Sequence, residues 1–338
     1  MSAPDQADVA PLTRGVVEPL PSAESGRNAA VAKYDAHIKY RPDIDGLRAI
    51  AVLSVIGFHA FPEWFPGGFV GVDIFFIISG YLISSIIFEQ VQEGRFTIGG
   101  FYVRRIKRIF PSLIVILIFC LVGGWYILFP HEYKLLGKHI AGGAGFSSNF
   151  VLWRESGYFD SAAETKPLLH LWSLGIEEQF YFFWPAAIYL AWKRRLNMLG
   201  VILALVLGSF ALNLLFLGTK AIATFYLPFT RVWELLIGGI LAHADHDRKL
   251  SSTPGSFHRV GLSPNVQSMV GAGLIVASLF ILNRYAAFPG WWALLPCLGA
   301  YFIISAGMKA WINQKVLSQQ VLVWFGLISF PLYLWHWP

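Results

Sequence analysis

Long apolar segments separated by short polar ones recur from residue 46 to the end of the chain. A helix needs about 20 apolar residues to cross the hydrocarbon core of a bilayer. Nine segments approach or exceed that length, near residues 46–64, 67–88, 109–129, 172–192, 198–217, 225–243, 267–283, 290–307 and 321–338. The pattern predicts an all-α polytopic membrane protein with about nine transmembrane helices, the last of them truncated at Pro338.

Composition agrees with this prediction and excludes an ordinary soluble domain. The 338 residues are 56% hydrophobic and only 14% charged, with a mean hydropathy of +0.56. Residues 1–40 have no long apolar run, so we expect a disordered cytosolic tail before a transmembrane domain at 41–338. Cys120 and Cys297 lie inside apolar runs, which predicts packing residues, and no metal site is expected.

The basic residues predict the orientation of the chain. With residue 1 in the cytosol, nineteen lysines and arginines fall in cytosolic segments and six in external ones, a strong positive-inside asymmetry. Their spread over many loops explains the net charge of +6 without a nucleic-acid partner. The glycine-rich stretch from Lys134 to Trp153 is interpreted as an outer-surface or re-entrant helix, because a full crossing there would reverse every later loop.

Arg48 and His59 are two ionisable residues within the first apolar run. Eleven residues make almost three helical turns, so both side chains are predicted on one helix face, about 16 Å apart along the axis. Ionisable residues inside a membrane are costly and by default mark a functional site.

Four basic residues crowd the predicted cytosolic surface between the second and third spans: Arg104, Arg105, Lys107 and Arg108. One interpretation is topology and attraction to anionic lipid, worth about 1 kcal/mol per charge. The other is a phosphate clamp, since guanidiniums at i and i+3 can hold one polyanion. Arg48 is expected at the same depth, one span away.

Small and acidic residues interrupt the second and sixth spans. Asp73 lies near the outer end of the second, and Ser79 with Gly80 in its middle, which indicates either close helix packing or room for a thin ligand. In the sixth span Arg231 and Glu234 are neighbours on one helix face, where they either neutralise each other or belong to a site.

The fourth span contains His170 at its outer end and the adjacent carboxylates Glu177 and Glu178. Adjacent side chains project about 100° apart on a helix, so at most one of the two glutamates is expected to face a given cavity. By predicted depth, His59, the acidic residues and Arg231 fall in the outer half of the bilayer, whereas Arg48, Arg105 and Arg108 fall at its inner face. The pattern therefore predicts a site with a polyanion grip inside and an acid/base cluster nearer the outside.

Six motifs occur in order: YRPDIDGLRA leading into Arg48 and His59, FFIISGYLI, RRIKRIFP, LHLWSLGIEEQFYFFWP, RVWELLIGG and FPLYLWHWP. This series resembles the acyltransferase family 3 membrane proteins, which O-acylate cell-envelope glycans such as lipopolysaccharide O-antigen, peptidoglycan and exopolysaccharide. The resemblance covers about residues 40–338. It implies a bacterial inner-membrane enzyme with an acyl-CoA donor, usually acetyl-CoA, bound from the cytosol, and an acceptor hydroxyl on a glycan or lipid-linked glycan at the far side.

The resemblance also suggests roles for the polar residues. It implies that Arg48, Arg105 and Arg108, with Arg104 beside them, hold the CoA phosphates. His59 is then the catalytic imidazole, and Glu177 or Glu178 belongs to the same site. The candidates for binding the acceptor are Asp73, His170, Arg231, Glu234 and His336.

Two chemical routes are open for His59. A buried, neutral His59 can take a proton from the acceptor hydroxyl, with a neighbouring glutamate fixing its tautomer. Alternatively, an acyl-His59 or acyl-Ser79 intermediate passes the group on. Family members usually continue past YLWHWP with another span, and many then carry an SGNH-type domain, so the chain is expected to be truncated at Pro338. His336 is a site residue or an interfacial one.

A transporter or flippase without acyl chemistry is the main alternative, because intramembrane Arg, His and Glu also build substrate pathways. Inverted repeats would favour it, but each charged motif occurs once. A glycosyltransferase is a third class and would more often show an acidic metal or sugar-nucleotide motif in a loop; the sequence has neither.

Overall fold

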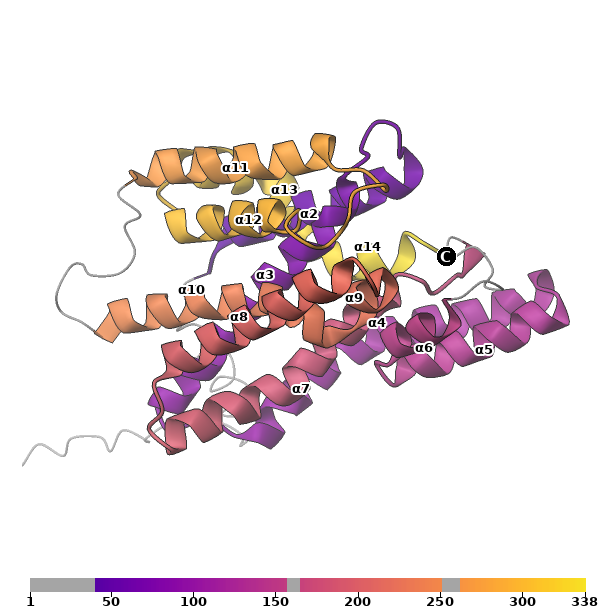
Figure 1. The fold of residues 1–338 in the computed structure, drawn as a ribbon, viewed down its shortest axis with the longest axis horizontal. Coiled ribbons are helices and arrows are strands. Elements are labelled where there is room, and N and C mark those ends of the chain that lie inside the picture. The colour runs from indigo at the N-terminus through magenta and orange to yellow at the C-terminus, as the bar shows by residue number, and fades with distance from the viewer. Residues whose placement is uncertain (1–39, 157–164, 251–261) are drawn as a thin grey trace, which may run out of the picture. The chain divides into compact units, whose positions relative to one another are not determined.

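Helices form the regular structure of this computed structural model, which describes residues 40–156, 165–250 and 262–338 (Figure 1). Those residues contain no β-strand, so the all-α prediction is confirmed for them. The tail predicted at 1–40 lies outside the described residues apart from Tyr40. The α-helices are α2 (Pro42–Ala60), α3 (Gly71–Gln92), α4 (Ile98–Ile127), α5 (Pro130–Ala144), α6 (Ser148–Glu155), α7 (Leu171–Lys193), α8 (Met198–Leu217), α9 (Ala221–Tyr226), α10 (Val232–Leu250), α11 (Pro264–Ile281), α12 (Leu294–Ala306), α13 (Gln320–Leu327) and α14 (Ser329–Trp335).

Four helices of the described residues are long and apolar enough to cross a membrane: α3 with the turn before it (Gly68–Gln92), α4, α8 and α11. Large apolar side chains remain exposed along α4 and α8, which a lipid environment favours and water does not. Helices α2 and α7 are of similar length but contain the charged residues of the candidate site. The count of nine spans and the cytosolic N-terminus stay predictions.

Two differences between the helix boundaries and the predicted apolar runs affect the candidate site. The basic cluster is not a loop between spans, because it lies inside α4, where burial of Phe101 and Ile109 on either side stabilises the helix. The predicted last span is split near Ile328 into α13 and α14. Helix α13 packs mainly on α2, whereas α14 contacts both α2 and α4. The two halves of the run therefore pack against different helices.

Helix α3 lies at the centre of the helices and packs most extensively against α10, with further contacts to α2, α7 and α12 (Figure 1). Gly80 and Gly238 make the α3–α10 approach possible. A Cβ at Gly80 would lie 1.8 Å from the Leu235 carbonyl oxygen, and one at Gly238 would lie 2.2 Å from that of Ile77. Close packing therefore explains Gly80, and it fixes Asp73 on α3 near the start of α10.

An ionic cluster joins α5 and α6 to the segment before α7. The Glu155 carboxylate lies 2.7 Å from Lys138 Nζ, 2.9 Å from His139 Nε2 and 3.2 Å from Lys166 Nζ. Burial lowers the pKa of His139, although Glu155 opposes this shift. Burial would raise the pKa of Glu155, but contacts with the two lysines and His139 outweigh it and the pKa is lowered. The cluster ties together the segments beside the candidate site.

Candidate functional site

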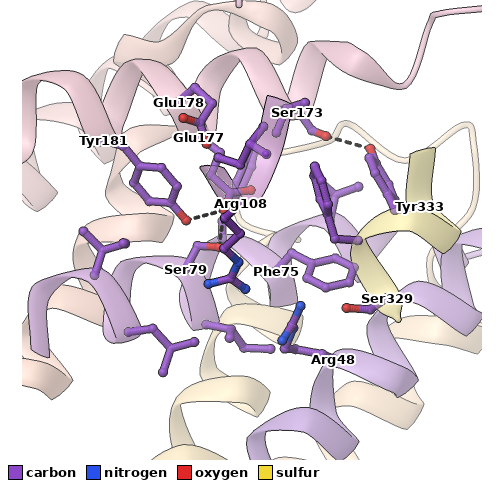
Figure 2. A pocket seen from close by; sticks show the side chains of 18 of the residues that line it. Arg48, Phe75, Ser79, Arg108, Ser173, Glu177, Glu178, Tyr181, Ser329 and Tyr333 are labelled. Atoms are coloured by element: carbon purple, nitrogen blue, oxygen red, sulfur yellow. Dashed lines mark hydrogen bonds between the residues drawn. The ribbon is translucent and has the colours of Figure 1, made fainter. Parts of the chain in front are cut away.

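A narrow cavity of about 90 Å³ lies between α2, α3, α4, α7 and α14. We call it the arginine cavity. Six residues predicted from the sequence line it: Arg48, Ser79, Arg105, Arg108, Glu177 and Glu178. Figure 2 shows Arg48 and Arg108 pointing into the same space from opposite sides. Helix packing thus brings together the arginines of the predicted polyanion grip, from two helices far apart in the sequence.

The arginines of this cavity are only partly neutralised by protein groups. Arg48 Nη1 lies 3.2 Å from Asp45 Oδ1. The Arg105 guanidinium lies over the rings of Phe101 and Tyr181, at 5.7 and 5.5 Å from their centroids. Within the described residues, neither Arg105 nor Arg108 forms an ion pair with a carboxylate. Three guanidiniums that line one narrow cavity, two of them without an ion pair to a carboxylate of the described residues, favour an anionic ligand.

Arg104 takes a different position from its neighbours on α4. Its Nη2 donates to Gln90 Oε1 of α3 at 3.1 Å, and the residue does not line the arginine cavity. On the helix Arg108 projects between Arg104 and Arg105, which point about 100° apart. The cavity side of α4 includes Arg105 and Arg108, and Arg104 turns toward Gln90 of α3 instead.

Both adjacent glutamates line the arginine cavity, so the expectation that at most one could face it is wrong. The cavity covers an arc of α7 that includes positions 173, 174, 177, 178 and 181, which is wide enough for neighbouring side chains. Glu177 Oε1 accepts a hydrogen bond from Ser79 Oγ at 2.5 Å and another from the Tyr181 hydroxyl (Figure 2). Glu178 Oε1 is buried without a hydrogen-bond partner among the described residues.

His59 lies outside the arginine cavity, at the last turn of α2, and is exposed rather than buried. Its Nδ1 is 3.1 Å from Nε2 of His336, and the ring of His336 packs edge-on against His170 with centroids 5.3 Å apart. We call His59, His170 and His336 the histidine cluster. The sequence predicted a glutamate beside His59; the structure places His336 there, and the glutamates with the arginines.

A second cavity of about 500 Å³, the aromatic cavity, lies beside the histidine cluster. His59, His170, Asp73 and Arg231 line it, and Glu234 does not. Its apolar lining is mostly rings, from Phe58, Phe69, Trp172, Phe225, Tyr226, Phe288, Tyr333 and Trp337. A third cavity of about 390 Å³, lined by His59, Lys166 and His336 among others, lies next to His59. His59 therefore borders two open spaces.

The buried charges beside the aromatic cavity form a compact group. Arg231 Nη2 donates to Asp73 Oδ1 at 3.0 Å, and Arg231 Nε lies 3.3 Å from Glu234 Oε1. The guanidinium also lies within 5.4–5.7 Å of four ring centroids, those of Phe76, Trp172, Phe225 and Phe288. The Arg231 guanidinium thus forms ion pairs with two carboxylates, that of Glu234 on α10 and that of Asp73 on α3.

Tyr333 and Ser173 are site residues that sequence reasoning missed. Tyr333 lines both the arginine cavity and the aromatic cavity. Its hydroxyl lies 2.6 Å from Ser173 Oγ (Figure 2). The same hydroxyl donates to the His170 carbonyl oxygen at 3.0 Å. One feature of the sequence could have indicated Tyr333: it precedes His336 by three residues in the last motif, so on a helix the two side chains share a face.

Comparison with known proteins places the chain among membrane acyltransferases. A family model described as an acyltransferase domain (acyltransferase family 3) matches residues 41–338. The chain is 33% identical to the peptidoglycan O-acetyltransferase OatA of Listeria monocytogenes and to YrhL of Bacillus subtilis, which is provisionally named a peptidoglycan O-acetyltransferase; each match covers 89% of the chain and 49% of the relative. It is 34% identical to SAS0844 of Staphylococcus aureus, provisionally named an O-acetyltransferase, over 88% of the chain and 50% of the relative. The chain thus spans about half the length of the curated relatives it matches. No solved structure matches it.

Proposed function

The chain belongs to the acyltransferase family 3, and from this premise we propose that it transfers an acyl group, preferably acetyl, from cytosolic acyl-CoA to a hydroxyl of an extracytoplasmic envelope glycan. The observation that carries the proposal is the arrangement along α2. Arg48 in the arginine cavity and His59 beside the aromatic cavity lie on one continuous helix, about 16 Å apart. This separation matches the reach of an extended pantetheine arm.

The donor would bind through its phosphates at Arg48, Arg105 and Arg108. Guanidiniums are suited to bidentate contacts with phosphate oxygens, and those of Arg105 and Arg108 form no ion pair with a carboxylate of the described residues. A cavity of about 90 Å³ is too narrow for a nucleotide but suits a thin arm. In this arrangement the nucleotide stays at the cytosolic mouth, and Ser79 and Tyr181, which are held by Glu177, line the path of the arm.

The acceptor would bind in the aromatic cavity. Sugar rings present apolar faces that stack on aromatic side chains and hydroxyl groups that need polar partners. The cavity offers both, with Trp172 and Tyr226 among its rings and Asp73 among its polar lining residues. The names of the relatives make peptidoglycan the first acceptor to test.

His59 would act as the general base at the junction of the two substrates. The acceptor O–H bond breaks as its proton moves to His59, the oxygen forms a bond with the thioester carbonyl carbon, and the C–S bond breaks. His59 then returns the proton to the departing sulfur, which leaves as the CoA thiol. Direct transfer is favoured over an acyl-Ser79 route, because Ser79 lines the arginine cavity and not the aromatic cavity in which the acceptor would bind.

The test uses the purified protein in liposomes, supplied with acetyl-CoA radiolabelled in the acetyl group and with peptidoglycan or other envelope glycans. Label should appear on the glycan. His59→Ala should abolish transfer with little loss of folded protein, while His131→Ala, at an exposed histidine of α5, should match the wild type. Wild-type transfer by His59→Ala would overturn the catalytic assignment, and failure of the wild type to bind CoA would overturn the donor.

A further inference from the structure

A chain of two hydrogen bonds runs from the backbone of α14 to His59. His336 Nδ1 lies 2.5 Å from the carbonyl oxygen of Tyr333. His336 Nε2 lies 3.1 Å from His59 Nδ1. Within the described residues, Nε2 of His59 has no hydrogen-bond partner.

The direction of these bonds follows from the first of them. A carbonyl oxygen can only accept, so Nδ1 of His336 carries the proton. In a neutral imidazole the other nitrogen is then an acceptor, so His336 Nε2 accepts from His59 Nδ1–H. We propose that His336 is a positioning residue that holds His59 in the tautomer with its proton on Nδ1 and its lone pair on Nε2. The role of that lone pair as a base rests on the proposed function.

The charged groups near His59 and His336 favour the neutral form of both imidazole rings. No carboxylate contacts His59 or His336 among the described residues. The charged groups that line the adjoining cavities are Lys166, Asp73, Arg231 and Arg284, and Asp73 is already paired with Arg231. A second proton on the pair would therefore have no counter-ion, which disfavours the imidazolium in the resting state.

Packing holds His336 in this orientation. Tyr333, which supplies the carbonyl, is fixed to α7 through its hydroxyl. Trp337 packs on the His59 ring with centroids 4.4 Å apart, and its Nε1 donates to the Lys166 carbonyl oxygen at 2.7 Å. When His59 gains a proton during transfer, its Nδ1–H already donates to His336, which stabilises the transient charge. The sequence predicted that a neighbouring glutamate has this role, fixing the tautomer of His59.

Substitution of His336 tests the inference by kinetics. His336→Phe keeps an aromatic ring but removes the acceptor, so kcat should fall by about tenfold to hundredfold, with KM for acetyl-CoA unchanged. His336→Gln restores a side-chain acceptor and should recover most of kcat. His131→Phe, the same change at an exposed histidine, should behave as the wild type. Wild-type kcat in folded His336→Phe would overturn the proposal, as would equal losses in His336→Phe and His336→Gln.

Nitrogen-15 NMR of histidine-labelled protein gives a readout that needs no activity, with the His59 signals assigned from their loss in His59→Ala. The wild type should show His59 protonated on Nδ1 and not on Nε2, and His336→Phe should shift that balance. A proton on Nε2 of His59 in the wild type would overturn the inference. Because this measurement is made without substrates, it separates a wrong tautomer from a failure of the proposed acyl transfer.

Discussion

Replacing Arg231 tests how buried charges hold α3 against α10. The guanidinium contacts Asp73 at 3.0 Å and Glu234 at 3.3 Å, and all three side chains are fully buried. Arg231→Leu removes the cation and leaves two carboxylates without a counter-charge. Removing one partner of such a group is costly because the remaining charge stays away from water.

The size of the effect follows from the contact between Arg231 and Asp73. At an effective dielectric constant of 20, opposite charges 3.0 Å apart attract by about 5.5 kcal/mol, and desolvation offsets much of this in the intact pair. Breaking a buried pair by removing one partner costs about 3–5 kcal/mol. We expect the free energy of unfolding of Arg231→Leu to fall by that amount. Adding Asp73→Asn and Glu234→Gln should recover most of it, because no buried charge is then unpaired.

The measurement is thermal unfolding of the purified variants in detergent, followed by tryptophan fluorescence. Arg231→Leu should unfold several degrees below the wild type, and the triple variant should lie between the two. An unchanged melting temperature for Arg231→Leu would refute the reasoning. A triple variant no more stable than Arg231→Leu would also refute it, because the loss would then come from packing against the aromatic rings and not from unpaired charge.

Three further predictions concern packing, donor binding and pH. Gly80→Ala should destabilise the protein by about 1–3 kcal/mol, because its Cβ overlaps the α10 backbone, whereas Gly208→Ala adds a Cβ in open space and should not; equal melting temperatures would contradict this. Arg108→Gln should raise KM for acetyl-CoA about tenfold with little change in kcat, and an unchanged KM in initial-rate assays would remove Arg108 from donor binding. Between pH 7 and about 5 the melting temperature of the wild type should fall more than that of His139→Gln. The lowered pKa keeps His139 neutral in the folded protein, so only the unfolded chain binds a proton there. Equal falls in the two melting temperatures would contradict this. The lowered pKa of Glu155 adds a further loss as the pH falls below the usual pKa of a glutamate, because the unfolded chain takes up that proton while the folded carboxylate stays ionised.

The apolar pattern could predict which segments are helical, because burial and lipid contact both act on runs of about 20 residues. It could also place Arg48 and His59 on one helix, since their spacing is a property of α2 alone. It could not place Glu177, because the rotation of α7 relative to α2 and α4 depends on packing between distant segments. The break near Ile328 could not be predicted for the same reason. Both halves of the run are apolar, and α13 and α14 differ only in the helices that they contact.

The break before α14 has a consequence for how the two cavities relate. Because α14 is a separate short helix, Tyr333 can lie between the arginine and aromatic cavities while its carbonyl oxygen faces His336 one turn later. If the pantetheine arm takes the proposed path, it must pass the Tyr333 side chain to bring a thioester to His59. A substitution at Tyr333 would then disturb donor passage and the orientation of His336 together. Only changes at His336, which lines the third cavity and not the arginine cavity, separate the tautomer of His59 from the entry of the donor.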